Sequence, residues 1–250
     1  MAPLVTLEGV GKGFRNGVVA LDGIDLAIES GAFVSLLGPS GCGKSTLLRI
    51  ISGLIEPSRG TRRWTGDTAA PGTIGFVFQE PTLMPWASVT DNIYLPLRFA
   101  GVARRAAAPR VAEAIAAVGL EGFADAFPRE LSGGMKMRVS IARAFITRPR
   151  LLLLDEPFAA LDEITRLKLN EDLLRLWQSE RWTVVFVTHS VFESVFLANR
   201  VVVMTRHPGR IAADLEIELP YPRETTLRTT AEYGLQCRAV SQSLAAAMAA

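Results

Sequence analysis

The sequence has few cysteines and no hydrophobic stretch long enough to span a membrane. Cys42 and Cys237 are its two cysteines, so a framework of disulfides is excluded and a reducing cytosol fits best. Its apolar runs fall short of the roughly 18 residues of a membrane-spanning helix. The first residues lack the charged-then-apolar layout of a signal peptide. We therefore expect a chain that stays inside the cell and does not itself cross a bilayer.

A strong net charge is also missing. The 27 Lys and Arg residues against 25 Asp and Glu leave a formal charge of +2, which gives no electrostatic case for nucleic acid as the main partner. The length of 250 residues is enough for one domain with an inserted lobe or for two small ones. The hydrophobic fraction of 49% is high, which an Ala-rich composition or a partner-facing surface explains.

What the sequence does contain is a glycine-rich stretch between two apolar runs. It matches the spacing G-x-x-x-x-G-K-[ST], which is typical of a phosphate-binding loop between a strand and a helix. The glycines let backbone N–H groups point inward, and the helix start adds further N–H groups. We expect Lys44 to reach the β- and γ-phosphates of a nucleoside triphosphate and Ser45 to place its hydroxyl on Mg²⁺. The loop residues are Gly38, Pro39, Ser40, Gly41, Cys42, Gly43, Lys44, Ser45 and Thr46.

Three further apolar runs end in polar side chains, which are Gln79, Asp155 with Glu156, and His189. Ligands of open α/β sheets bind at the carboxyl ends of strands. Carboxylates at the end of a buried strand are costly unless a cation or hydrogen bonds satisfy them. We therefore predict Asp155 as a Mg²⁺ ligand and Glu156 as the group that polarises the attacking water. Gln79 is a candidate for contacting Mg²⁺ or that water, and His189 is a candidate functional histidine at the same sheet edge.

The segment between about 81 and 148 is predicted to form consecutive helices inserted into an α/β core, with helical spacing at 89–98, 105–118 and 120–126. Its last helix follows Leu131-Ser132-Gly133-Gly134 and runs to about Ile146. Ser132 is a good N-cap, and the two glycines expose first-turn N–H groups. This is a second helix start suited to an anion, without a lysine of its own.

The N-terminal residues predict an antiparallel hairpin. Two β-forming stretches, 4–9 and 18–28, flank the turn Arg15-Asn16-Gly17. Phe14 precedes that turn, where it can either stack on a nucleobase or pack into the core. Towards the C-terminus we expect a helix over 163–180, strands at 201–204 and 210–217, and weak helical character over 231–248.

Taken together, these motifs resemble the ATPase subunit of an ABC transporter. The resemblance covers the Walker A loop (38–46), the Q-loop residue Gln79, the signature motif (131–135), Walker B with its catalytic glutamate (151–156), the D-loop (160–162), the switch residue His189 and the A-loop position Phe14. Two departures are Met135, where glutamine is most frequent, and Ser190, where aspartate commonly follows the histidine.

The family resemblance implies a fold and a division of the chain. It implies an α/β P-loop NTPase core with a mixed, largely parallel sheet, an N-terminal antiparallel β piece and an inserted helical lobe. All of 1–250 would form one ABC ATPase domain. Residues 1–80 and 149–220 would make the core, 81–148 the lobe and 221–250 a C-terminal helical tail.

The resemblance also implies partners. Two copies would face head to tail, so that Ser132, Gly133 and Gly134 of one copy cover the ATP held by the other, with Asp162 among the ATP-site residues. This homodimer would sit peripherally on the cytoplasmic face of the membrane, drive two permease subunits and depend indirectly on a periplasmic solute-binding protein. Nucleic acid is not among the implied partners.

Within the family, the stretches 80–86, 196–204 and 208–211 resemble the nitrate, sulfonate and taurine importer group, which takes up small, mostly anionic solutes. Trp86 can either contact the permease or lie buried in the lobe. The solute stays open, and a hydroxymethylpyrimidine-type precursor is a second candidate. The competing hypotheses for the chain are an efflux cassette, a soluble ABC ATPase of DNA repair or translation, and a P-loop small-molecule kinase.

Overall fold

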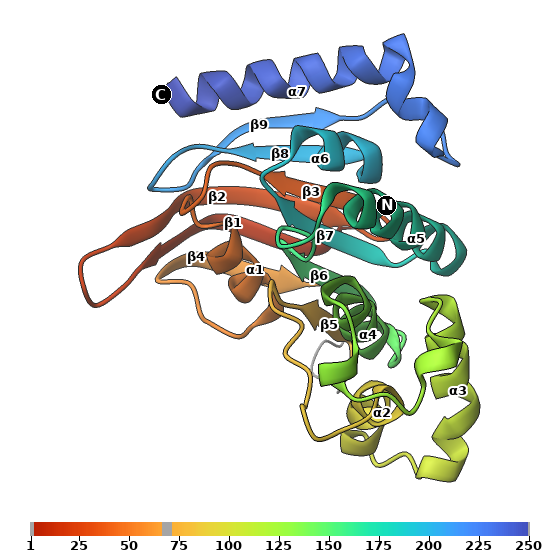
Figure 1. Ribbon diagram of the computed structural model, residues 1–250. Helices are drawn as coiled ribbons and strands as arrows, with labels where there is room; N and C mark the ends of the chain where they lie inside the picture. Colours follow the sequence, from red (N-terminus) through yellow and green to blue (C-terminus); the bar gives the residue numbers. More distant parts are fainter. Residues whose placement is uncertain (1–2, 67–71, 250) are drawn as a thin grey trace. The chain divides into compact units, whose positions relative to one another are not determined.

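The computed structural model (Figure 1) describes residues 3–66 and 72–249. The chain divides into two compact units. The first unit combines Met1–Thr68 with Arg181–Ala250, and the second is Ala69–Glu180. The predicted core, lobe and tail boundaries stay a prediction.

An antiparallel sheet of the order β2-β1-β4 opens the first unit. Its strands are β1 (Pro3–Gly13), β2 (Val19–Glu29) and β4 (Arg59–Trp64). The Phe14 N–H donates to Val18 O over 2.8 Å, which closes the predicted hairpin turn, and Gly17 has the left-handed φ of 83° that such a turn favours.

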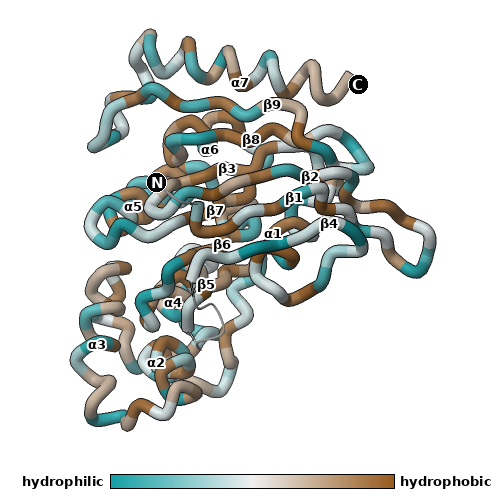
Figure 2. The backbone as a smooth tube through the Cα atoms, turned by 180° about the vertical axis from the view of Figure 1, so that it is seen from behind, coloured by the Kyte–Doolittle hydropathy of each residue, from teal (hydrophilic) through white to brown (hydrophobic). Residues whose placement is uncertain are grey.

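The core of the first unit is built on β3 (Phe33–Leu37), which pairs in parallel with β7 (Thr183–Thr188) and β8 (Arg200–Met204). An antiparallel edge strand, β9 (Ile211–Glu216), pairs with β8. Every residue of β3 and β7 is buried, and both strands are predominantly apolar, as the hydropathy colouring of Figure 2 shows. Such continuous apolar runs are typical of parallel strands covered on both faces.

The helices of the first unit are α1 (Lys44–Ser52), α6 (Val191–Leu197) and α7 (Ala231–Ala249), with a 3₁₀ turn, η3 (Thr225–Thr229). Helix α7 contacts α6, β8 and β9 (Figure 1). The helix predicted weakly over the tail is therefore present. Helix α6 is short, and the sequence pattern does not predict it.

In the second unit, β5 (Ile74–Val77) pairs in parallel with β6 (Leu151–Asp155). Its helices are α2 (Val89–Phe99), α3 (Arg104–Ala117), α4 (Gly133–Phe145) and α5 (Glu163–Glu180), with 3₁₀ turns η1 (Glu121–Phe123) and η2 (Pro128–Glu130). The mixture of helices with parallel and antiparallel sheets confirms the predicted α/β class. Across residues 3–66 and 72–249, every helix is too short or too polar to cross a membrane.

The helix predicted over 120–126 is wrong, because only the 3₁₀ turn η1 forms there. The carbonyls of Ala124 and Ala126 accept from the N–H groups of Thr90 and Val89 over 3.0 and 2.9 Å. The chain is therefore tied to the start of α2 and does not continue a helical ladder of its own.

Candidate functional site

The phosphate-binding loop joins the buried end of β3 to α1. Gly41 and Gly43 have φ values of 78° and 101°, and Gly43 is the N-cap residue of α1. A β-carbon on Gly43 would lie 2.7 Å from Ala20 O, so glycine is required there by both conformation and space. Gly43 makes no side-chain cap hydrogen bond to the start of α1, and a helix N-terminus that begins in this way is suited to an anion.

Lys44 lies inside this loop and is only 4% exposed. Its Nζ donates to Gly38 O over 2.8 Å and to Pro39 O over 3.0 Å. The loop thus brings a buried ammonium, a glycine turn and a helix N-terminus together. This set of donors fits a polyphosphate, and Ser45 follows directly in the first turn of α1.

His189 lies at the same edge of the sheet as this loop. Leu37, the last residue of β3, is in register with Thr188, the last residue of β7. The next residues, Gly38 and His189, therefore leave the sheet side by side. The side chain of His189 is exposed. Its predicted place beside Gln79 and Asp155 stays a prediction.

Phe14 is 44% exposed, which argues against the core-packing alternative. The Nζ of Lys12 lies 5.6 Å from the centre of its ring. The hairpin strand that follows Phe14 continues to Ala20, whose backbone borders Gly43 of the phosphate loop. Phe14 is thus a solvent-facing aromatic on the hairpin that packs against the loop.

In the second unit, Val77 of β5 is in register with Leu154 of β6. Gln79 and Asp155 therefore follow from the same edge of neighbouring strands. Asp155 is buried, with 6% exposure, whereas Gln79 is exposed. Glu156 has a φ of 46°, a left-handed conformation that is strained for a residue with a β-carbon. Such strain is concentrated at functional sites, which adds a structural argument to the sequence argument for Glu156.

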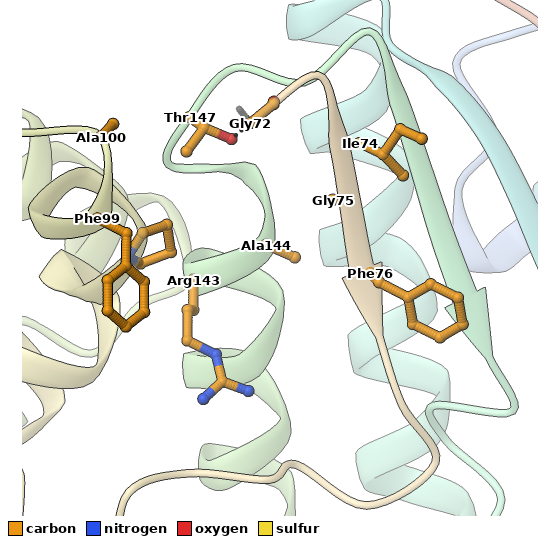
Figure 3. A pocket seen from close by; sticks show the side chains of 10 residues that line it. Gly72, Ile74, Gly75, Phe76, Phe99, Ala100, Arg143, Ala144 and Thr147 are labelled. Atoms are coloured by element: carbon orange, nitrogen blue, oxygen red, sulfur yellow. Dashed lines mark hydrogen bonds between the residues drawn. The ribbon is translucent and has the colours of Figure 1, made fainter. Parts of the chain in front are cut away.

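Sequence reasoning missed Arg143, which fixes the segment just after Gln79. From α4 its guanidinium donates to Pro81 O, Thr82 O and Thr82 Oγ1, each over 2.9 Å. Burial lowers the pKa of Arg143. Figure 3 shows Arg143 between β5 and Phe99, beside a pocket of about 300 Å³. An arginine within a helix gives no sequence signal for this contact.

The signature segment forms the N-terminus of α4. The hydroxyl of Ser132 accepts from the Met135 N–H over 3.3 Å, which confirms the predicted N-cap. Ser132 and Gly133 are exposed. Gly134 is buried against α5, where a β-carbon would lie 2.7 Å from Thr165 Cγ2. The sequence thus builds a close helix–helix contact that leaves the start of α4 open to solvent.

Asp162 caps α5, because its Oδ1 accepts from the Thr165 N–H over 2.9 Å. This hydrogen bond to the ionised carboxylate lowers the pKa of Asp162. The structure therefore gives Asp162 a capping role, and its predicted place at the ATP site stays a prediction.

Comparison with known proteins identifies the family to which these motifs belong. Residues 21–159, more than half of the chain, match the family model described as ABC transporter. The chain belongs to the ABC transporter family of ATP-binding proteins. As a member of this family it is an ATPase, and the predicted recognition and fold class are confirmed.

Several curated relatives of this ABC ATPase cover most of its length. It is 48% identical over 220 residues to an uncharacterised ABC transporter ATP-binding protein of Methanocaldococcus jannaschii, which covers 87% of this chain and 82% of the relative. It is 44% identical to an aliphatic sulfonates import ATP-binding protein of Bacillus cereus, with 89% of each chain covered.

Solved structures of ABC cassettes are similar as well. A subunit of an ABC transporter complex from Clostridium perfringens has a TM-score of 0.79 and 27% identity, over 87% of this chain and 90% of that one. A dimeric ATP-binding cassette with bound ADP and phosphate has a TM-score of 0.73 and 33% identity, over 86% of this chain and all of that one.

Proposed function

We propose that this ABC ATPase powers the import of a small anionic solute of the sulfonate type through separate permease subunits. The observation that carries this proposal is the 44% identity, over 89% of both chains, to an aliphatic sulfonates importer subunit. The ATPase would act at the cytoplasmic face of the membrane, and a periplasmic binding protein would deliver the solute.

In the first unit, the phosphate loop would hold ATP. The buried Lys44 ammonium would exchange its two loop carbonyls for phosphate oxygens, and the first-turn N–H groups of α1 would donate to the same anion. Phe14 would stack on the adenine. Ser45, Asp155 and Gln79 offer the oxygen ligands that Mg²⁺ prefers. The ion would neutralise charge on the phosphates.

Glu156 is the proposed general base for the attacking water. Glu156 follows the buried strand β6, and its backbone has a strained, left-handed conformation. The backbone therefore fixes the direction in which the Glu156 side chain leaves the strand end. His189 and Gln79 would orient the water and the γ-phosphate. Because phosphoryl transfer depends mainly on positioning and charge neutralisation, these roles need no covalent intermediate.

A second copy of the chain is the proposed partner for the exposed start of α4. Ser132 and Gly133 present N–H groups without a cation of their own, and a cassette with 33% identity is dimeric with bound ADP and phosphate. In the proposed homodimer, these groups would cover the nucleotide bound by the other copy. Binding energy of ATP would then stabilise the closed dimer.

The proposed permease contact lies on the second unit around Trp86. This side chain is 75% exposed, which argues against the alternative that it is buried. It borders a pocket of about 460 Å³ that Tyr94 and Arg98 of α2 also line. An exposed tryptophan beside a polar and aromatic pocket is suited to anchor a helix of a partner protein.

Reconstitution tests the proposal. The chain should copurify with its permease subunits, and in proteoliposomes supplied with the binding protein it should drive ATP-dependent uptake of an alkanesulfonate. Glu156→Gln in the same complex is the control for the ATP requirement. ATP-dependent movement of the solute only outward would contradict import. A thermal-shift screen of the binding protein against sulfonates, nitrate and hydroxymethylpyrimidine identifies the solute.

A further inference from the structure

Helix α6 connects the candidate residue His189 to the C-terminal segment of the chain. It begins at Val191, directly after His189 and the N-cap residue Ser190, and it ends at Leu197. A helix of this length leaves most of its carbonyl groups without intrahelical partners. Buried carbonyls need hydrogen-bond donors from outside the helix. The groups that donate to the carbonyls of α6 therefore also fix the position of the helix.

The start of α6 is closed around His189 by three side chains. Thr188 Oγ1 donates to Glu193 Oε2 over 2.5 Å and accepts from the Ser190 N–H over 3.0 Å. Ser190 Oγ accepts from the Glu193 N–H over 3.3 Å. Thr188 and Glu193 are buried. The backbone on both sides of His189 is therefore tied to the first turn of α6, and a shift of that turn would shift the backbone of His189.

The far end of α6 is held by Arg223. Its Nη1 donates to the carbonyls of Val195, Phe196 and Ala198 over 2.8, 3.0 and 2.9 Å. Its Nη2 donates to Leu219 O over 3.0 Å, and the residue is only 5% exposed. A cation at a helix C-terminus is also favoured by the helix dipole. One guanidinium thus donates to three carbonyls at the end of α6.

Two tyrosines complete the contact. Tyr221 OH donates to Leu197 O over 3.0 Å, and Tyr233 OH, from α7, donates to Phe192 O over 2.8 Å. Burial raises the pKa of Tyr221 to about 12 and also raises that of Tyr233, so both hydroxyls stay protonated as donors at neutral pH. The C-terminal segment therefore donates hydrogen bonds to α6 from the first turn of the helix to its end.

We propose that the C-terminal segment, through Tyr221, Arg223 and Tyr233, positions His189 by fixing α6. These are positioning residues, because they act through the helix and not on the nucleotide. The proposal rests on the proposed role of His189 in hydrolysis. Catalytic groups lose activity steeply when displaced by about 1 Å, so a small tilt of α6 is enough to lower turnover while the phosphate loop still binds ATP.

Removal of single hydroxyls tests this without removing the buried guanidinium, whose loss endangers folding. Tyr233 OH donates to a main-chain carbonyl of α6. In the second unit, Thr90 Oγ1 likewise donates to a main-chain carbonyl, that of Ala124, over 2.9 Å, which makes Thr90→Val a matched control. For Tyr233→Phe we expect kcat to fall about fivefold, corresponding to the loss of one hydrogen bond, with ATP affinity unchanged. Thr90→Val should leave kcat unchanged.

The decisive measurement is a double-mutant cycle with His189→Ala, followed by single-turnover hydrolysis of labelled ATP. If Tyr233 acts through His189, Tyr233→Phe should have no further effect in the His189→Ala background. An equal loss in both backgrounds, or equal effects of Tyr233→Phe and Thr90→Val, would overturn the proposal. Normal turnover by His189→Ala would instead overturn the role of His189 itself, and the positioning role with it. The two failures are thus distinguishable.

Discussion

The two units each present a helix N-terminus, and the two differ in what they can hold. Helix α1 follows Gly43 and places the buried ammonium of Lys44 within the loop. Helix α4 follows Ser132, whose hydroxyl already accepts from Met135, and its exposed start is made of glycine. A buried ammonium together with several N–H groups can bind an anion without help from a partner. The N–H groups and the dipole of a helix start without a cation contribute less to anion binding. The first helix start is therefore suited to binding and the second to completing a site.

The acidic residues are a second difference between the two units. In the second unit β6 ends at Asp155, and Glu156 follows it. In the first unit β3 leads into the phosphate loop instead. Carboxylates repel phosphates unless a cation lies between them, so the second unit gains little from binding ATP directly. In the proposed mechanism, these acidic residues act in the reaction that follows binding. Substitutions in the two units should therefore separate affinity from turnover.

The largest effect is expected for Glu156→Gln in the second unit. Loss of the general base should lower turnover by about 10²- to 10⁴-fold, while ATP affinity stays close to wild type. Phosphate release and binding of a fluorescent ATP analogue measure the two quantities. Glu180→Gln, at the exposed end of α5, is the control and should behave as wild type. Near-normal turnover by Glu156→Gln would exclude it as the base.

Lys44→Ala should produce the opposite separation. Removal of the ammonium from the phosphate loop should weaken ATP binding by about 100-fold, the order expected when charge-assisted hydrogen bonds to phosphate are lost. Isothermal titration with MgATP measures this. Lys168→Ala, exposed on α5, is the charge-matched control. If Lys44→Ala bound ATP as tightly as the control, the assignment of the loop would be wrong.

The sequence predicted the phosphate-binding loop and the polar residues that follow the strands better than the helix and the contacts that support them. Glycine spacing around Lys44 and the polar residues after apolar strands are local patterns, so their placement could be predicted. The helix at 191–197 was missed because two turns are too short to show a hydrophobic period. The left-handed φ of Glu156 and the carbonyl contacts of Arg143 and Arg223 depend on tertiary packing. A pattern along the chain does not encode such contacts.

Ser132→Ala tests the weaker helix start. It should lower turnover about tenfold at saturating ATP, because one donor or acceptor to the bound nucleotide is lost, without changing ATP affinity of the single chain. It should also cost about 1 kcal/mol of stability as an N-cap. Ser88→Ala removes a matched cap, since Ser88 Oγ accepts from the Asp91 N–H over 3.1 Å in α2. It should lose similar stability and keep its turnover.

These two serine variants decide between a structural and a functional cap. Thermal unfolding and ATPase rates are measured for both proteins at the same concentration. If Ser88→Ala lost as much turnover as Ser132→Ala, the effect would come from helix stability alone, and α4 would have no part in the site.

The smallest effect is expected for Phe14, which would contact the adenine of ATP with an aromatic ring and no charge. Phe14→Ala should weaken ATP binding about fivefold, since an aromatic stacking contact contributes roughly 1 kcal/mol. Phe14→Tyr should retain the affinity. Pyrophosphate, which has no base, should bind all three proteins equally in a competition titration. An equal loss for ATP and pyrophosphate would mean that Phe14 acts by holding the hairpin against Gly43, so that the phosphate loop, and not the adenine, depends on it.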